Sequence, residues 1–271
     1  MNGLPQRIVC LTTETTEVLY LLGEQDRIVG ISGYTTRPAI ARKEKPKVAA
    51  FTSAKIDKIL ALEPDLVIGF SNLQAEIAAS LISAGVEVHV FNQRSVDDIL
   101  RMILSTGRLV GATEKAEKLV SELQAQIESV RETASYLPRK PKVYFEEWDE
   151  PMMCSIRWAA ELIGIAGGED CFPELTKFQS ARDRIVTPQQ VAERQPDIII
   201  GSWCGKKFQP EQVMARPGWA EIPAVRDGHL YEIKSADILQ PGPSAITHGL
   251  KQIQTIIQQW GARQAHLKHW G

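Results

Sequence analysis

Four carboxylates fall within five residues around one tryptophan, in the segment Glu146, Glu147, Trp148, Asp149 and Glu150. Carboxylates gathered at the end of a strand could hold a hard cation, or supply an acid and a base. In an extended segment alternate side chains share a face, so Glu147 and Asp149 would point the same way and the other two would not. The simpler interpretation is a solvated loop rim that accepts hydrogen bonds from the amides of a ligand or keeps the loop soluble, and we prefer it.

Aromatic and sulfur-bearing side chains follow several of the strands that we expect. The candidates are Tyr34, Phe51, Trp148, Met152, Met153, Trp158 and Trp203. Open α/β sheets bind ligands at the carboxyl ends of their strands, so we expect these side chains to line a binding site. Flat aromatic faces can clamp a planar macrocycle at low entropic cost. Trp219 and Trp260 lie in helical or turn contexts, and for these two we expect core packing.

Histidine and nucleophile patterns are sparse. His248 follows the sequence PGP on an amphipathic helix and could face a metal centre, although a surface or core position is the simpler interpretation. No two histidines lie at ligand spacing, and neither a G-x-S-x-G elbow nor a phosphate-binding glycine loop is present. We therefore expect no catalytic residue, no metal site, no catalytic cofactor and no enzyme. The candidate ligand-binding residues are Tyr34, Phe51, Glu147, Trp148, Met152, Trp158, Trp203, Asp237 and His248.

Two stretches of the chain, residues 55–69 and 188–201, repeat one pattern. Each predicts a short helix, a stop at Pro64 or Pro196, and an apolar strand buried on both faces. A unit of this size that occurs twice indicates two similar α/β lobes, and two lobes form a cleft. The cleft is where we expect the ligand to bind.

Strands and helices alternate along the whole chain, which predicts parallel sheets covered by helices. We expect strands near residues 7–11, 27–31, 65–70, 86–91, 142–146, 197–202 and 229–233. Helices are expected near residues 14–23, 54–62, 72–84, 95–110, 156–166, 187–194, 209–214 and 243–260.

One long helix is expected to connect the two halves. Residues 114–135 carry apolar side chains at helical spacing without an internal glycine or proline, which predicts a rigid helix of about 33 Å. The fold class is therefore α/β, with two Rossmann-like lobes of parallel sheet, one rigid connecting helix and a ligand cleft that changes little on binding. We expect an amino-terminal lobe over 1–113, the connecting helix over 114–137 and a carboxyl-terminal lobe over 138–271.

The composition excludes several classes of protein. The 271 residues are 44% hydrophobic and 24% charged with a formal net charge of −2, so neither nucleic acid nor an anionic membrane surface is an expected partner. No apolar run approaches the roughly 20 residues that span a bilayer, so we expect no membrane insertion. The four cysteines show no metal-ligand spacing, and we expect them to be free thiols. Separately, we expect the protein to be a monomer.

Several short segments, in their order and spacing, follow the pattern of a known family. They are RIVCLT (7–12), ETTE (14–17), VGISGY (29–34), ALEPDLV (61–67), IAGGE (165–169) and LQPGP (239–243). Together they resemble the class III substrate-binding proteins of ABC importers, which carry cobalamin, haem or ferric siderophores between two α/β lobes. Tyr34, the segment EWDEPM (147–152) and the turn at 167–168 are most similar to the cobalamin-binding branch. The resemblance implies cobalamin or a related corrinoid as the ligand.

The resemblance also implies a membrane partner. Family members dock on their permease through an acidic residue on each lobe, and the matching positions here are Asp57 and Gln189. An arginine that faces a neutral amide loses the charge-assisted part of its hydrogen bond, so Gln189 should weaken docking of the second lobe. The family is periplasmic or on the cell surface. However, Met1 is followed almost directly by the first strand, with no visible signal peptide, and a cytoplasmic corrinoid-binding relative is the alternative.

Three further functional hypotheses compete with corrinoid binding. Two of them keep the same two-lobed scaffold: a haem or ferric-siderophore binding protein, and an enzyme such as a metal chelatase. A chelatase would need His248 and the carboxylates of 146–150 to face one cleft. The other hypothesis is an interaction module whose cleft has collapsed around Trp148 and Trp203.

Overall fold

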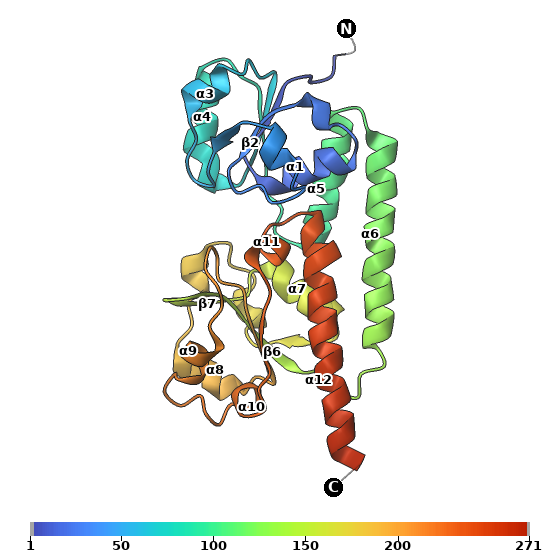
Figure 1. The fold of residues 1–271 in the computed structure, drawn as a ribbon, viewed down its shortest axis with the longest axis vertical. Coiled ribbons are helices and arrows are strands. Elements are labelled where there is room, and N and C mark those ends of the chain that lie inside the picture. Colours follow the sequence, from blue (N-terminus) through green and yellow to red (C-terminus); the bar gives the residue numbers. More distant parts are fainter. Residues whose placement is uncertain (1–2, 270–271) are drawn as a thin grey trace. The chain divides into compact units, whose positions relative to one another are not determined.

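The computed structural model describes residues 3–269 and divides the chain into two compact units (Figure 1). Unit 1 comprises the chain up to Leu123 together with Pro241–Pro243, and unit 2 comprises Gln124–Gln240 and the chain from Ser244 onward. None of the helices in the described part is long and apolar enough to span a bilayer.

Unit 1 contains a five-stranded parallel sheet with the strand order β3-β2-β1-β4-β5. Its strands are β1 (Ile8–Cys10), β2 (Ile28–Ser32), β3 (Lys47–Ala49), β4 (Leu66–Phe70) and β5 (Val88–Phe91). The central strands β1 and β4 are buried along their whole length, and for β4 the apolar run in the sequence predicted this. The predicted strands are confirmed here, and β3 is additional.

Helices cover the sheet of unit 1. They are α1 (Thr13–Leu21), α2 (Ala41–Glu44), α3 (Ile56–Leu60), α4 (Ala75–Ser83) and α5 (Val96–Leu109). Val9 and Val67 of the sheet pack in one cluster with Ile59 of α3 and Leu81 of α4. Helix α1 contacts both α5 and the strands β1 and β2.

Unit 2 is built on a second five-stranded sheet with the order β10-β9-β6-β7, to which β8 adds by pairing with β6. The strands are β6 (Lys142–Asp149), β7 (Met152–Cys154), β8 (Glu169–Asp170), β9 (Ile198–Gly201) and β10 (Leu230–Glu232). One strand departs from the parallel arrangement that we predicted, because β7 runs antiparallel to β6. Only Glu150 and Pro151 separate β6 from β7, and so short a connection can join only antiparallel strands.

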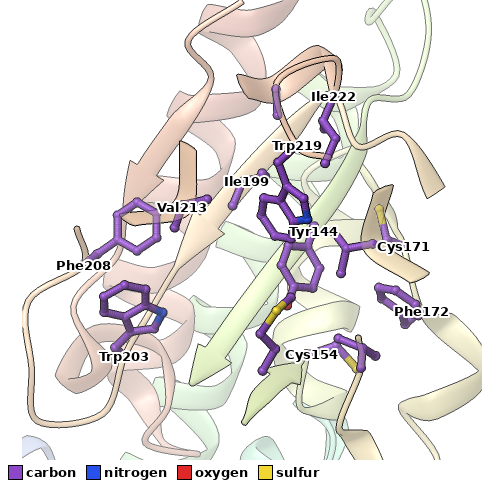
Figure 2. Close-up of a cluster of buried hydrophobic side chains, with 14 residues drawn as sticks. Tyr144, Cys154, Cys171, Phe172, Ile199, Trp203, Phe208, Val213, Trp219 and Ile222 are labelled. Atoms are coloured by element: carbon purple, nitrogen blue, oxygen red, sulfur yellow. The ribbon is translucent and has the colours of Figure 1, made fainter. Parts of the chain in front are cut away.

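The helices of unit 2 are α7 (Arg157–Ile165), α8 (Pro188–Arg194), α9 (Pro210–Met214), α10 (Pro223–Arg226), α11 (Ser235–Ile238), the π-helical turn Ala245–Leu250 and α12 (Lys251–His269). The side chains of neighbouring residues in β6 pack on opposite faces of the sheet. Tyr144 packs in the cluster that includes Val191 of α8 and Val213 of α9 (Figure 2), whereas Val143 lies near Ile163 of α7 and Ile257 of α12.

The repeated pattern in the sequence corresponds to a repeated structure. Helix α3 leads to β4 in unit 1, and α8 leads to β9 in unit 2. In each copy the residue before the proline adopts the left-handed conformation, with φ of 46° at Glu63 and 49° at Gln195. A left-handed residue followed by proline ends a helix sharply. The prediction of two related helix-stop-strand units is therefore confirmed.

The predicted connecting helix is present as α6 (Thr113–Ala134), with 22 residues. Its apolar side chains Ala116, Val120, Leu123 and Ile127 are buried at helical spacing. A second passage of the chain into unit 1, at Pro241–Pro243, was not foreseen from the sequence. There Gln93 Nε2 donates to the carbonyl oxygen of Pro241 at 3.1 Å.

Packing at the end of β9 yields a stability prediction. A Cβ at Gly201 would overlap the ring of Phe208, which is itself 2% exposed and cannot move aside. We expect Gly201→Ala to lower the free energy of unfolding by about 1–3 kcal/mol, the usual cost of overpacking. Gly164→Ala is the matched control, because nothing lies near its Cβ on the exposed side of α7, and it should be neutral or stabilising. Urea unfolding of both variants checks this; equal midpoints would contradict it.

Candidate functional site

The first carboxylate of the acidic segment, Glu146, is fully buried at the centre of unit 2. Arg216 donates to it through Nη1 to Oε2 at 2.6 Å and through Nη2 to Oε1 at 2.8 Å. The Tyr144 hydroxyl donates to Oε2 at 2.9 Å, and Trp203 Nε1 donates to Oε1 at 3.0 Å. Four donors therefore surround one carboxylate, which is how a charge is accommodated away from water.

The ionisation of this network follows from its surroundings. Burial would lower the pKa of Arg216, but hydrogen bonds to Glu146 and its charge more than offset that effect, so the pKa is raised. Burial and then the charge of Glu146 raise the pKa of the Tyr144 phenol well above its usual range. The guanidinium therefore stays charged and the phenol stays a hydrogen-bond donor at neutral pH.

The next two carboxylates are also paired, each with a different basic side chain. Glu147 Oε2 accepts from Arg184 Nη1 at 2.6 Å, and the Arg184 side chain is only 1% exposed. Asp149 Oδ2 accepts from Lys206 Nζ at 2.7 Å, and Oδ1 lies within ion-pair distance of the same nitrogen at 2.5 Å. No group of carboxylates, histidines and cysteines suited to a metal ion occurs in the part of the chain that the structure describes. The acidic segment is thus a set of three ion pairs, with Glu150 exposed beside them.

Two indoles meet the paired lysine at the same edge of the sheet. Lys206 Nζ lies 4.6 Å from the ring centroid of Trp148 and 5.0 Å from that of Trp203. Trp148 Nε1 donates to the carbonyl oxygen of Glu150 at 2.8 Å. We call Trp148, Asp149, Trp203 and Lys206 together the indole-lysine corner. Both indoles are fixed by hydrogen bonds, and cation-π attraction holds the ammonium over their faces.

Three of the predicted ligand-binding side chains are largely buried. Trp203 is 3% and Met152 6% exposed, and both belong to the core cluster of unit 2, where Trp203 packs against Phe208 with ring centroids 5.1 Å apart (Figure 2). Trp158 is 2% exposed, and its Nε1 donates to the carbonyl oxygen of Ile238. The core positions expected for Trp219 and Trp260 are confirmed.

The predicted residues of unit 1 are exposed. Tyr34 is 61% and Phe51 40% exposed, after the ends of β2 and β3 respectively. Arg42 Nη1 donates to the carbonyl oxygens of Gly33 and Thr35, and so fixes the backbone on both sides of Tyr34. Sequence reasoning did not include Arg42, because nothing in the local pattern shows that its side chain reaches back to this turn.

Asp237 and His248 lie near the carboxyl-terminal helix of unit 2. Asp237 Oδ2 accepts from Gln252 Nε2 at 3.0 Å. His248, exposed on the π-helical turn, has its Nδ1 2.8 Å from Thr247 Oγ1. Neither side chain joins a cluster of metal-ligating groups among residues 3–269.

The four cysteines are free, as predicted. Cys10, Cys154 and Cys171 are buried and Cys204 is exposed. Burial raises the thiol pKa of Cys10 to about 11 and that of Cys154 to about 12. Thiols with such pKa values stay protonated at neutral pH and are poor nucleophiles.

The two predicted docking positions are both exposed. Asp57 lies on α3 and Gln189 on α8, in the two copies of the repeated unit. Gln189 Nε2 donates to Glu193 Oε1 at 2.9 Å, one turn further along α8. The helix tip of unit 2 therefore carries an amide held against a carboxylate.

Comparisons with known proteins agree with this architecture. A family model described as "Periplasmic binding protein" matches residues 8–236. A Vitamin B12-binding protein of Vibrio campbellii is 27% identical over 270 residues, covering 95% of this chain and 93% of its own. Two solved structures share the fold. The periplasmic Vitamin B12 binding protein BtuF of Vibrio cholerae has a TM-score of 0.75, with 20% identity over 94% of this chain and 98% of its own. The periplasmic heme-binding protein RhuT of Roseiflexus has a TM-score of 0.79, with 23% identity over 93% and 99%.

The buried carboxylate of unit 2 yields a second stability prediction. Glu146→Gln would leave the guanidinium of Arg216 without its counter-charge, and we expect the free energy of unfolding to fall by about 3 kcal/mol. Glu150→Gln removes the same charge from an exposed side chain and should change stability by less than about 0.5 kcal/mol. Urea or thermal unfolding distinguishes the two. If both variants unfold at the same midpoint as the unmodified protein, Glu146 does not have the structural role assigned to it.

Proposed function

We propose that this chain, which belongs to the periplasmic binding protein family, binds a corrinoid as the substrate-binding component of an ABC importer. Substrate binding is the general property of this family, whose members are not enzymes. The choice of a corrinoid is our own inference, and it depends on the chemistry of the indole-lysine corner.

The observation that carries the proposal is an aromatic surface whose charges are compensated. Glu146, Glu147 and Asp149 each have one cationic partner. The sheet edge that carries Trp148 therefore offers a flat apolar surface without a strong positive or negative electrostatic potential. A corrin ring is a large flat ligand with neutral carboxamide side chains, and suits such a surface. A porphyrin with two carboxylates would be favoured by unpaired cations instead.

The relatives point in the same direction. The curated relative from Vibrio campbellii, which matches 95% of this chain, is named for vitamin B12. The solved neighbours named for B12 and for haem are at most 23% identical to this chain, and therefore support its fold without separating the two ligands.

Ferric haem is the second candidate, for one specific reason. The Tyr34 side chain is 61% exposed, and a phenol oxygen is an accepted axial ligand of haem iron. If ferric haem binds through Tyr34, mixing should shift the haem absorption band, and Tyr34→Phe should abolish that shift. A corrinoid site requires no such dependence.

Corrinoid binding can be measured directly. After mixing with cobalamin and desalting, the protein should retain the corrinoid absorption spectrum. Its tryptophan fluorescence should also fall, because the corrinoid would contact the partly exposed Trp148 and absorb close to the buried Trp203. Trp148→Ala should weaken binding by about 1–3 kcal/mol, the usual contribution of a contact-forming aromatic side chain. Tyr136→Ala removes a 79% exposed aromatic elsewhere and should leave affinity unchanged. A titration to micromolar corrinoid without quenching would refute the proposal.

Docking on a permease is a separate part of the proposal. If Asp57 and Gln189 are the two docking positions, the unmodified protein should bind a corrinoid importer's permease weakly. Gln189→Glu should then strengthen binding several-fold in a salt-sensitive way, because it supplies a carboxylate for an arginine. The new carboxylate would lie beside Glu193, and repulsion across one helical turn costs only a few tenths of a kcal/mol.

The control for docking is Gln212→Glu, which adds the same charge to exposed helix α9 and should have no effect. Binding is measured with permease in nanodiscs at low and physiological salt. If the unmodified protein already binds and stimulates its transporter at physiological salt, the glutamine is tolerated. If Gln189→Glu binds the permease no more tightly than Gln212→Glu does, this docking assignment is wrong. That result would favour the alternative of a corrinoid-binding protein that does not dock on a permease.

A further inference from the structure

The ammonium of Lys206 is held by three groups and still reaches solvent. It contacts both oxygens of Asp149 and lies over the rings of Trp148 and Trp203. The Lys206 side chain is 42% exposed. An ammonium has three hydrogens to donate, and two carboxylate oxygens leave at least one of them for another acceptor.

The aromatic surface beneath Lys206 is fixed by hydrogen bonds and packing. Trp203 donates to Glu146 and packs against Phe208, and the Trp148 indole donates to the carbonyl oxygen of Glu150. The cationic side chain of Lys206 thus lies on a fixed aromatic surface, and its counter-charge is Asp149.

We propose that the Asp149–Lys206 pair determines which side chains of a macrocycle this site accepts. The paired ammonium donates to the oxygen of a neutral carboxamide without any change in the charge of the site. A ligand carboxylate must instead compete with Asp149 for the same ammonium, and the two negative charges repel each other at close range. The pair therefore favours amide-bearing rings over carboxylate-bearing rings, an inference that rests on the proposed binding of a macrocycle at this corner.

The balance of the neighbouring charges supports this assignment. Segments 146–150 and 202–208 carry four carboxylates and two lysines, and Arg184 and Arg216 supply two more cations. Glu146 and Glu147 are paired with these arginines, so Asp149 is the carboxylate that pairs with the ammonium lying over the two indoles. Removing its charge would leave Lys206 as an uncompensated cation on the aromatic surface.

The test measures a ratio of affinities for two probes, dicyanocobinamide, which has carboxamide side chains, and metal-free protoporphyrin IX, which has two carboxylates. Asp149→Asn should shift the ratio about tenfold toward the porphyrin, because the ammonium becomes available to a carboxylate. Glu150→Gln makes the same change of charge one residue away, on an exposed side chain, and should shift the ratio less than about threefold. Metal-free porphyrin is used so that no axial ligand contributes.

A second variant keeps the test independent of how Asp149→Asn folds. Lys206→Met leaves Asp149 as an unpaired negative charge and should shift the ratio the other way, toward cobinamide. The double variant Asp149→Asn with Lys206→Met should return near the ratio of the unmodified protein. Equal shifts in Asp149→Asn and Glu150→Gln, or no shift in any variant, would overturn the inference.

Failure of the proposed function has a different signature. If the unmodified protein binds neither probe, the corrinoid proposal fails. The role of the pair is then decided by whether Asp149→Asn, and not Glu150→Gln, gains porphyrin binding. A gain confined to Asp149→Asn supports the inference, and no gain in either variant overturns it.

Discussion

The buried ion pair between Glu146 and Arg216 is the interaction on which the candidate site depends. Removing two charges from water costs several kcal/mol, and the attraction between them repays that cost only when every remaining hydrogen-bonding site is satisfied. Here the Tyr144 hydroxyl and the Trp203 indole complete the shell of the carboxylate. The same hydrogen bond that satisfies Glu146 fixes Trp203 at the end of β9, so the stability of the core and the geometry of the site share one group.

The exposure of the side chains increases from the buried Glu146 carboxylate through Trp203 and Trp148 to Lys206. Trp203 is almost wholly buried, Trp148 is partly exposed, and the ammonium of Lys206 lies over both rings with access to solvent. An aromatic surface that is fixed before a ligand arrives loses little side-chain entropy on binding, which is the advantage of pre-organisation. In unit 1, Arg42 donates hydrogen bonds to the backbone on both sides of the exposed Tyr34. The backbone entropy lost there on ligand binding should therefore also be small.

Much of the fold could be predicted from the sequence, because its signals are local. Buried strands such as β4 and β9 are continuous apolar runs, and α6 has a helical period of apolar side chains over six turns without a breaker. The strands β3, β7 and β8, each of two or three residues, were missed. The antiparallel direction of β7 follows from the two-residue connection to β6. Because β7 was not predicted as a strand, its direction could not be predicted either.

The site was less predictable, since its contacts join distant parts of the chain. We expected the acidic segment to be a solvated loop rim, but Glu146 is buried within β6 and three of the four carboxylates are paired. Their partners Arg184, Lys206 and Arg216 are 37, 57 and 70 residues away along the chain. Sequence spacing gives no indication of such pairs. It likewise does not distinguish Met152 and Trp158, which are buried, from Trp148, which reaches the surface, because all three are apolar residues near strand or helix ends.

The central claim is that a corrinoid binds against the indole-lysine corner, and the position of its cobalt tests that claim most directly. Crystals grown with cobalamin can be measured at the cobalt absorption edge, where anomalous scattering identifies the position of the metal. We expect one strong peak beside the Trp148 indole, with the corrin ring stacked against it. A fully occupied cobalt peak remote from both Trp148 and Trp203 would show that the corrinoid does not bind at this corner.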